Sequence, residues 1–262
     1  MVFAAVVFDF FGTLTPHTPA EVWDEHAARS AAPLGIPPRT WRAAIDASFP
    51  ERAVGALGDL RQTFRTLARR CGVEPDEAAL TAACEARRAA QRELFALREE
   101  ALPALEEIRA RGLRVGVLSD CTVELAESWS ELPLASRVDA AVLSCLEGRR
   151  KPDPEFFGTV TRRLGVEPGR CLYVGDGGGD ELRGASAYGM TAVMLRAPDL
   201  ADAGRRARRD AWTGPFVTSP AQVPALLDDP SALTAGPCRK PSTDSPADSP
   251  TVPSPGSGPD AG

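Results

Sequence analysis

Residues 2–14, VFAAVVFDFFGTL, indicate the architecture of the chain. Residues 2–9 form a continuous apolar run, rich in valine and phenylalanine, that ends at an acid, Asp9. Runs of this kind are typical of strands that are buried on both faces of a parallel sheet. Similar runs recur further along the chain, at residues 113–119, 138–144, 170–175 and 191–195.

Helical patterns separate these later strands. They cover residues 102–110, 124–132, 154–164 and 181–188. Strands that alternate with helices predict βαβ units, and therefore an α/β fold with a doubly wound parallel sheet of the Rossmann-like type. Because such crossovers are right-handed, the carboxyl ends of the strands meet at one edge of the sheet, where ligands bind.

The stretch between the first two predicted strands follows a different pattern. It holds no candidate for a strand, and its helical patterns cover residues 19–32, 38–47, 57–70 and 75–99. Helix starts and stops are marked by Pro19, Pro38, Asp76, Gly35 and Gly72. We therefore expect an α/β core at residues 1–15 and 100–230, with an α-helical cap inserted at residues 16–99.

The end of the chain, residues 231–262, differs in composition from the rest. It contains seven prolines and six serines, and its large aliphatic residues are Leu233 and Val252. Such a segment cannot bury enough apolar surface to offset the entropy lost on ordering. We expect residues 231–262 to be a disordered Pro/Ser-rich tail.

Composition narrows the possible partners. The formal net charge of -6 argues against a general nucleic-acid binder. No apolar run approaches the roughly 20 residues that a membrane helix needs, and the apolar N-terminus carries no basic segment of the signal-peptide kind. The six cysteines form no CxxC pair, which favours reduced thiols over a disulfide scaffold. We expect a cytoplasmic protein with a small-molecule partner, no nucleic acid and no membrane; oligomeric state does not follow from the sequence.

Polar residues follow the predicted strands. Taken singly, such residues are typical of helix caps and turns. In a parallel sheet, however, residues that follow the strands converge at one edge of the sheet. A carboxylate, a hydroxyl, an ammonium and two further carboxylates near glycines suit the binding of a dianion with a metal ion and its transfer to a side chain. These residues are Asp9, Ser119, Lys151, Asp176 and Asp180.

The lysine is unusual in this chain. Of the 30 basic residues, Lys151 and Lys240 are the lysines and all others are arginines. Lys240 lies in the predicted tail. Since a compact ammonium fits sites that a guanidinium does not, Lys151 is a candidate for a tight polar site.

The four segments, in this order, resemble the motifs of the haloacid dehalogenase-like (HAD) hydrolase superfamily, in the subfamily with an α-helical cap after the first motif. The resemblance extends from residue 2 to residue 227. Its motifs are FDFFGTLT at 8–15, VGVLSD at 115–120, GRRKPDPEFF at 148–157 and VGDGGGDELRGA at 174–185.

The resemblance implies a hydrolase that transfers a phosphoryl group through an aspartyl-phosphate. Asp9 would be the nucleophile, and Ser119 would hydrogen-bond the phosphoryl oxygens. Lys151 would neutralise charge on the nucleophile and the phosphate. The substrate would be a small phosphorylated metabolite, also contacted by the backbone at Phe10, Phe11 and Gly12 through oriented amides.

The same resemblance implies Mg²⁺ as cofactor. Its ligands would be Asp9, Asp176 and the backbone carbonyl of Phe11. Asp180 would complete the acidic site, by holding a metal-bound water or by orienting Lys151.

Phe11 departs from the phosphatase pattern, in which a second aspartate occupies this position and protonates the leaving group. Dehalogenases of the superfamily carry an aromatic residue there, so a 2-haloacid dehalogenase is an alternative. The acidic fourth motif favours the metal-dependent phosphatase, because those dehalogenases work without a metal. A catalytically weak member that binds a phosphorylated ligand or a protein is a third possibility. His17 or His26 could replace the missing acid.

The predicted tail yields a first test. Truncation after Pro230 should leave the melting temperature and the activity nearly unchanged, because few buried contacts are expected beyond that residue. Thermal denaturation and kinetics of the full and shortened chains measure both. A large fall in either would mean that the tail docks on the folded part.

Overall fold

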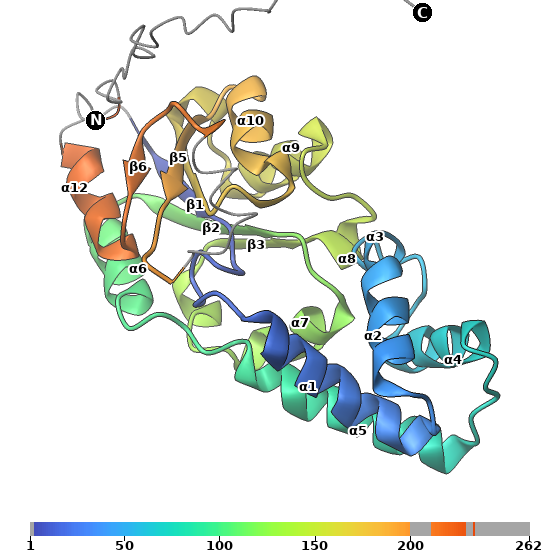
Figure 1. Ribbon diagram of the computed structural model, residues 1–262. Helices are drawn as coiled ribbons and strands as arrows, with labels where there is room; N and C mark the ends of the chain where they lie inside the picture. The colour runs from blue at the N-terminus through green and yellow to red at the C-terminus, as the bar shows by residue number, and fades with distance from the viewer. Residues whose placement is uncertain (1–2, 200–210, 229–232, 234–262) are drawn as a thin grey trace, which may run out of the picture.

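A six-stranded parallel sheet forms the centre of the computed structural model, which describes residues 3–199, 211–228 and 233 (Figure 1). Its strands follow the order β3-β2-β1-β4-β5-β6, and every neighbouring pair is parallel. The predicted α/β class with a doubly wound sheet is therefore confirmed. The strands are β1 (Ala5–Phe8), β2 (Arg114–Ser119), β3 (Ala140–Leu143), β4 (Cys171–Gly175), β5 (Thr191–Leu195) and β6 (Phe216–Val217).

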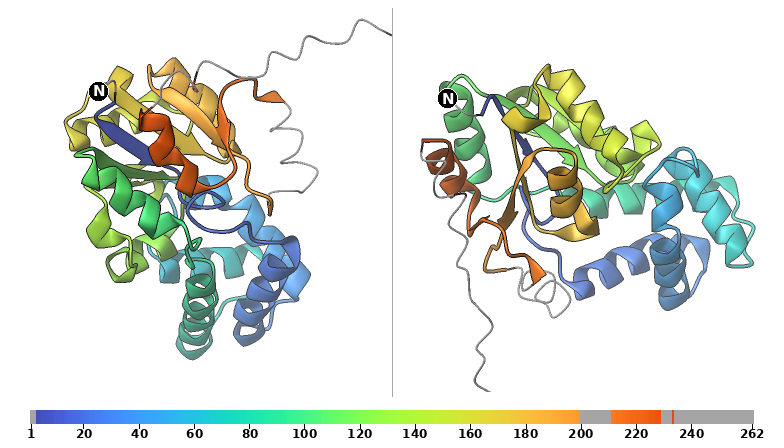
Figure 2. Two further views of the ribbon diagram at one scale, coloured as in Figure 1. Left: turned by 90° about the vertical axis from the view of Figure 1, so that its left-hand side faces the viewer. Right: turned by 90° about the horizontal axis from the view of Figure 1, so that it is seen from above.

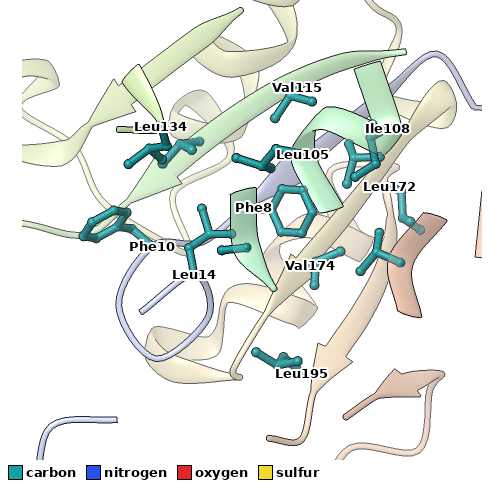
Figure 3. Close-up of a cluster of buried hydrophobic side chains, with 14 of the residues drawn as sticks. Phe8, Phe10, Leu14, Leu105, Ile108, Val115, Leu134, Leu172, Val174 and Leu195 are labelled. Carbon is teal, nitrogen blue, oxygen red and sulfur yellow. The ribbon is translucent and has the colours of Figure 1, made fainter. Parts of the chain in front are cut away.

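Helices cover both faces of the sheet, so alternate residues of each strand enter two separate cores. In β1, Val6 and Phe8 join the cluster beneath α6, whereas Ala5 and Val7 join the cluster beneath α9 and α10. Figure 3 shows the first of these clusters, with Phe8 against Leu105 of α6. Burial on both faces explains why the strands are uniformly apolar. The core helices are α6 (Ala101–Ala110), α7 (Val123–Ser128), α8 (Ser144–Glu147), α9 (Pro154–Leu164), α10 (Glu181–Ala187) and α12 (Val223–Asp228).

The order of the strands reverses at β1. The chain moves outward from β1 to β2 and β3, and then returns to place β4 on the other side of β1. Asp9 follows β1 at this point, and its backbone N–H donates to the carbonyl of Val174 in β4 at 2.9 Å. In doubly wound sheets, ligands bind at the carboxyl ends of the strands where the order reverses.

Five helices lie between β1 and α6, and we call this part the helical insert. Figures 1 and 2 show them gathered on one side of the sheet. They enclose a hydrophobic cluster of their own, in which the buried Trp41 packs edge-on against Phe64 and donates from Nε1 to Ser30 Oγ at 2.9 Å. The helices are α1 (Ala20–Ala31), α2 (Pro38–Ala47), α3 (Phe49–Arg52), α4 (Leu60–Arg70) and α5 (Glu77–Glu93).

The last insert helix is shorter than the sequence pattern predicts. A helix was expected over residues 75–99, but α5 ends at Glu93. Phe95 is buried in the core against Phe10, and the backbone N–H of Arg98 donates to the carbonyl of Leu14 at 2.8 Å. These contacts tie the returning chain to the loop after Asp9, and the chain leaves the helix to make them.

The predicted tail lies outside the described residues, except for Leu233. This side chain is partly buried against the cluster beneath α6, so truncation after Pro230 also removes that contact. A second truncation, after Leu233, separates its effect from that of the remaining tail. Within the described part of the chain, no helix is both long and apolar enough to cross a membrane.

Candidate active site

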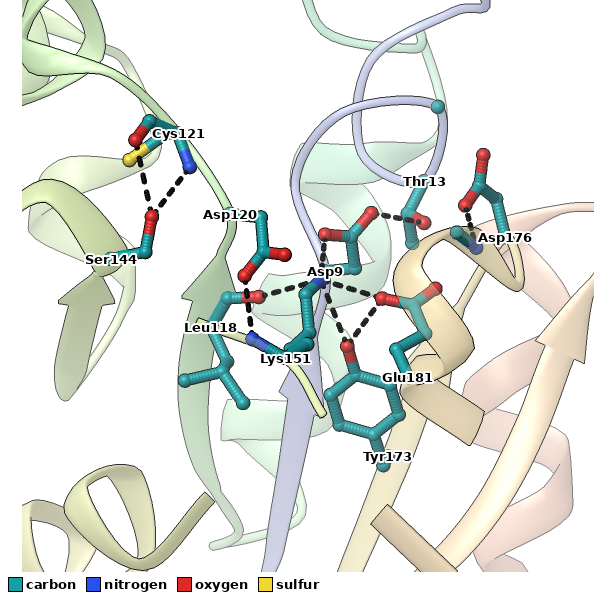
Figure 4. A network of polar contacts seen from close by, with 12 residues as sticks. Asp9, Thr13, Leu118, Asp120, Cys121, Ser144, Lys151, Tyr173, Asp176 and Glu181 are labelled. Atoms are coloured by element: carbon teal, nitrogen blue, oxygen red, sulfur yellow. Dashed lines mark hydrogen bonds and ion pairs between the residues drawn. The ribbon is translucent and has the colours of Figure 1, made fainter. Parts of the chain in front are cut away.

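The Lys151 ammonium is the centre of the polar network at the carboxyl edge of the sheet (Figure 4). Its Nζ lies 2.6 Å from Asp9 Oδ1 and 2.6 Å from Glu181 Oε2. It also contacts the Tyr173 hydroxyl at 3.3 Å and the carbonyl of Leu118 at 3.4 Å. One buried cation therefore connects β1, β2, β4 and the start of α10.

Burial and charge act in opposite directions on this lysine. Burial alone would lower the pKa of Lys151, but the attraction of Asp9 and Glu181 raises it well above its ordinary value. Burial also raises the pKa of Glu181, to about 7, although the neighbouring Lys151 lowers it in part. The ammonium thus remains charged and can neutralise negative charge beside it.

Asp9 is held in a fixed orientation. It is 5% exposed, and its Oδ2 accepts a hydrogen bond from the Thr13 hydroxyl at 3.0 Å, on the side away from Lys151. The loop turns back at Gly12, whose φ of 79° favours glycine. Phe10 anchors the loop because its side chain is fully buried in the core.

The acidic partner from the fourth motif is Glu181, and not Asp180 as the sequence predicted. Asp180 has a positive φ of 58° at the start of α10, and its side chain is 60% exposed, near Arg183. Glu181 points inward and accepts from the Tyr173 hydroxyl at 2.7 Å and from the backbone N–H of Gly177 at 2.9 Å. Gly175 makes this possible, since a Cβ there would overlap the Glu181 carboxylate.

Three buried carboxylates could hold a metal ion. Asp9, Asp176 and Glu181 each offer an oxygen within 4.8 Å of the others. Asp176 is oriented by the backbone N–H of Gly178, which donates to its Oδ1 at 2.8 Å. Oxygen donors of this kind suit Mg²⁺. Asp9 and Glu181 contact Lys151 directly, and the three residues together offer oxygens that a divalent cation could share.

Several donors near Asp9 are available for an oxyanion. The hydroxyl of Ser119 is fully buried and has no hydrogen-bond partner in the described part of the chain. The backbone N–H groups of Phe10 and Phe11 likewise have no acceptor among the described residues, whereas that of Gly12 donates to Thr15 Oγ1 at 3.2 Å. Buried donors without partners are rare in folded proteins and indicate a ligand position.

The Phe11 side chain faces the helical insert. It packs against Phe10, with ring centroids 4.9 Å apart, and lines a pocket of about 320 Å³ between the insert and the core. We call this cavity the insert pocket. Asp120, whose Oδ1 accepts from the backbone N–H of Lys151 at 2.9 Å, also lines it.

The two histidines lie elsewhere. The imidazole of His26 is buried in α1, with Nε2 3.2 Å from Glu93 Oε2. The backbone N–H of His17 donates to Asp199 Oδ2 at 2.7 Å. Neither residue lines the insert pocket. Cys121, which does line it, is a buried thiol 3.9 Å from Cys145 Sγ.

The crowding around Lys151 yields a second prediction. Lys151→Arg should lower the free energy of unfolding by about 1–3 kcal/mol, because the larger guanidinium overfills a closed site, and should remove most of the hydrolytic activity that the resemblance implies. Chemical denaturation and steady-state kinetics measure the two effects. Arg149→Lys, at an exposed position two residues away, is the control and should behave like the wild type. Unchanged stability and kinetics of Lys151→Arg would show that the site does not discriminate between the two cations.

Comparisons with known proteins identify relatives of this chain. The glyceraldehyde 3-phosphate phosphatase of Methanopyrus kandleri is 29% identical over 194 residues, which are 73% of this chain and 83% of that protein. A phosphatase of Mycobacterium tuberculosis is 38% identical over 99 residues, which are 37% of this chain and 45% of that protein.

Solved structures share the fold. The 2-haloacid dehalogenase of Pseudomonas syringae has a TM-score of 0.65 at 24% identity, over 86% of this chain and 98% of that chain. A HAD family enzyme of Bacteroides thetaiotaomicron, in complex with magnesium and inorganic phosphate, has a TM-score of 0.58 at 17% identity, over 75% and 96%. A family model described as haloacid dehalogenase-like hydrolase matches residues 3–189. The chain therefore belongs to the haloacid dehalogenase-like hydrolases.

Proposed function

We propose that the chain is a Mg²⁺-dependent phosphatase that hydrolyses a small phosphorylated metabolite through an aspartyl-phosphate on Asp9. The observation that carries this proposal is the cluster of buried carboxylate oxygens from Asp9, Asp176 and Glu181, which lie within 4.8 Å of one another and could share a divalent cation. A halide-releasing site has no need of a metal-binding cluster. The phosphatase names of two relatives support the same conclusion.

The chain's own residues perform the transfer as follows. A carboxylate oxygen of Asp9 attacks phosphorus as the bond from phosphorus to the leaving oxygen breaks. Lys151, the Ser119 hydroxyl and the N–H groups of Phe10 and Phe11 stabilise the charge on the phosphoryl oxygens. Water then attacks the aspartyl-phosphate and releases inorganic phosphate.

The Mg²⁺ ion would be held by Asp9, Asp176 and the Phe11 carbonyl, and when bound it supplies further neutralisation of phosphate charge. Glu181 has a different task in this arrangement. Its two oxygens already accept from Lys151, Tyr173 and Gly177, so it positions the ammonium beside Asp9. This is the orienting role that the sequence suggested for Asp180.

The helical insert would act as a cap over this site. It contributes most of the lining of the insert pocket, which adjoins the catalytic loop at Phe11 and the end of β2 at Asp120. The leaving group of the substrate would occupy this pocket. We propose that the chain works in the cytoplasm on small metabolites, without nucleic-acid or membrane partners.

Dehalogenation is the second candidate function, and Phe11 is the observation that favours it. The aromatic ring lines the pocket where a phosphatase of this family would carry an acid. Halide leaves without a proton, so a site without that acid suits it. The acidic cluster argues for the phosphatase.

A substrate panel distinguishes the candidates. Phosphate esters and 2-haloacids, each assayed with Mg²⁺ and with a chelator, should give phosphate release that requires Mg²⁺ and no halide release. Asp9→Asn should lower that rate by several orders of magnitude because the nucleophile is lost. Circular dichroism should show an intact fold, although the melting temperature should fall because Lys151 loses one of its two buried carboxylate partners. Metal-independent halide release would identify a dehalogenase. Saturable binding of a phosphorylated ligand or a protein without turnover would identify a binding protein.

Phe11 yields a prediction about leaving groups. General acid catalysis typically accelerates a reaction by about 10²–10⁴-fold. Without an acid at position 11, alkyl phosphates should therefore react slowly. Aryl and acyl phosphates have more acidic leaving groups, so their rates should fall less. Phe11→Asp should narrow this difference by accelerating the alkyl esters selectively.

The leaving-group dependence should be measured in the pre-steady-state burst, because water attack on the aspartyl-phosphate also lacks its usual base and can limit the steady state. A wild-type burst rate that is insensitive to leaving-group acidity would show that another residue donates the proton. The variant His17→Ala would then test whether His17 donates that proton.

A further inference from the structure

Two arginines of the helical insert share one carboxylate beside the insert pocket. Glu124 of α7 is buried, and its Oε1 accepts from Arg87 Nε of α5 at 2.8 Å. The Nη1 atom of Arg52, at the end of α3, lies 4.0 Å from the same oxygen. Both arginines line the pocket; Arg52 is 8% exposed and Arg87 is 3% exposed. The terminal nitrogens of Arg87 also lie 2.9 and 3.1 Å from the side-chain amide of Gln91, so Arg52 is the less completely paired of the two.

The remaining contacts of Arg52 do not cancel its charge. Its Nε donates to Ser48 Oγ at 3.0 Å and its Nη2 donates to the carbonyl of Ile45 at 3.0 Å, and both acceptors are neutral. Nη1 makes no hydrogen bond within the described part of the chain. Burial lowers the pKa of Arg52 to about 10, although the attraction of Glu124 and Asp46 raises it in part.

Arg42, the third arginine of the lining, is already paired. Its Nε donates to Asp46 Oδ2 at 2.8 Å, and a second carboxylate, that of Asp24, lies 3.6 Å from Arg42 Nη1. Asp120 accepts from the backbone N–H of Lys151. Within the described part of the chain, Arg52 is therefore the arginine of this pocket that has no hydrogen bond to a carboxylate.

Most of the rest of the lining is apolar, Gln91 and Thr122 being polar, and the space is limited. Phe11, Trp23, Ile45 and Phe49 contribute to its wall. The volume of about 320 Å³ is near the lower end of the roughly 300–1,000 Å³ of small-molecule sites. A compact ring or short carbon chain fits this wall, and a large coenzyme does not.

We propose that the leaving group of the substrate is a compact apolar framework that carries a carboxylate, and that Arg52 binds this carboxylate. A buried guanidinium with an unused donor costs free energy, and an anion supplied by the ligand removes that cost. Guanidinium groups recognise carboxylates through paired, charge-assisted hydrogen bonds. This inference rests on the proposed function, because it names the substrate class of the same site.

The test compares two isosteric substrates, 4-carboxyphenyl phosphate and 4-carbamoylphenyl phosphate, which differ in charge and little in shape. Hydrogen bonds to a charged group contribute about 1.5–3 kcal/mol, so kcat/KM should favour the carboxylate by roughly 10-fold or more. In Arg52→Gln this ratio should fall to near 1. Arg52→Lys keeps the charge and should retain part of the preference. Arg88→Gln, next to Arg87 but paired with Glu127 outside the pocket, is the matched control and should keep the wild-type ratio.

Binding of the products provides a readout that needs no turnover. Calorimetry should show that 4-hydroxybenzoate binds more tightly than 4-hydroxybenzamide, and that Arg52→Gln removes the difference. If 4-hydroxybenzoate binds in this way but neither phosphate is hydrolysed, the pocket assignment stands and the proposed function fails. Equal kcat/KM values for the two phosphates, or a preference that survives Arg52→Gln, would show that the arginines only hold the insert against α7.

Discussion

The rest of the site depends on one buried ion cluster, the ammonium of Lys151 between the carboxylates of Asp9 and Glu181. Buried charges are tolerated when they are paired and hydrogen-bonded, and removing one member leaves another without a partner. Through this cluster, segments that are far apart in the sequence hold one another in place: the ends of β1 and β2, the loop before α9, and the start of α10. Asp9, the proposed nucleophile, is therefore held in one orientation by Lys151 and Thr13.

Two kinds of charged group are separated in this arrangement. Three buried carboxylates lie close together at the carboxyl edge of the sheet, which suits a divalent cation with a phosphate. Two arginines, Arg52 and Arg87, share Glu124 beside α3 and α5. A ligand with a phosphate at one end and a carboxylate at the other matches this separation. The division also matches the architecture, because the core supplies the first set of charges and the insert supplies most of the second.

The sequence predicted the fold class well because strands buried on both faces must be continuously apolar. It also placed Asp9, Ser119, Lys151 and Asp176 at one edge, since the ends of parallel strands meet there. It missed β6 and α3, which are too short to show a periodic pattern. Asp180 was predicted in place of Glu181 as the acid that orients Lys151, because composition does not reveal which of two adjacent acids faces inward. Positive φ angles at Gly177, Gly179 and Asp180 decide that choice. The contacts of Arg52 involve residues from separate helices, so they cannot be predicted from a local sequence pattern.

The close approach of Gly175 to Glu181 makes these two positions interdependent. A Cβ at 175 would lie 2.2 Å from Glu181 Oε1, so a larger residue there must displace the carboxylate that contacts Lys151. Position 175 therefore constrains the placement of Lys151 through Glu181. The two positions should thus covary among relatives, with larger residues at 175 accompanied by shorter side chains at 181.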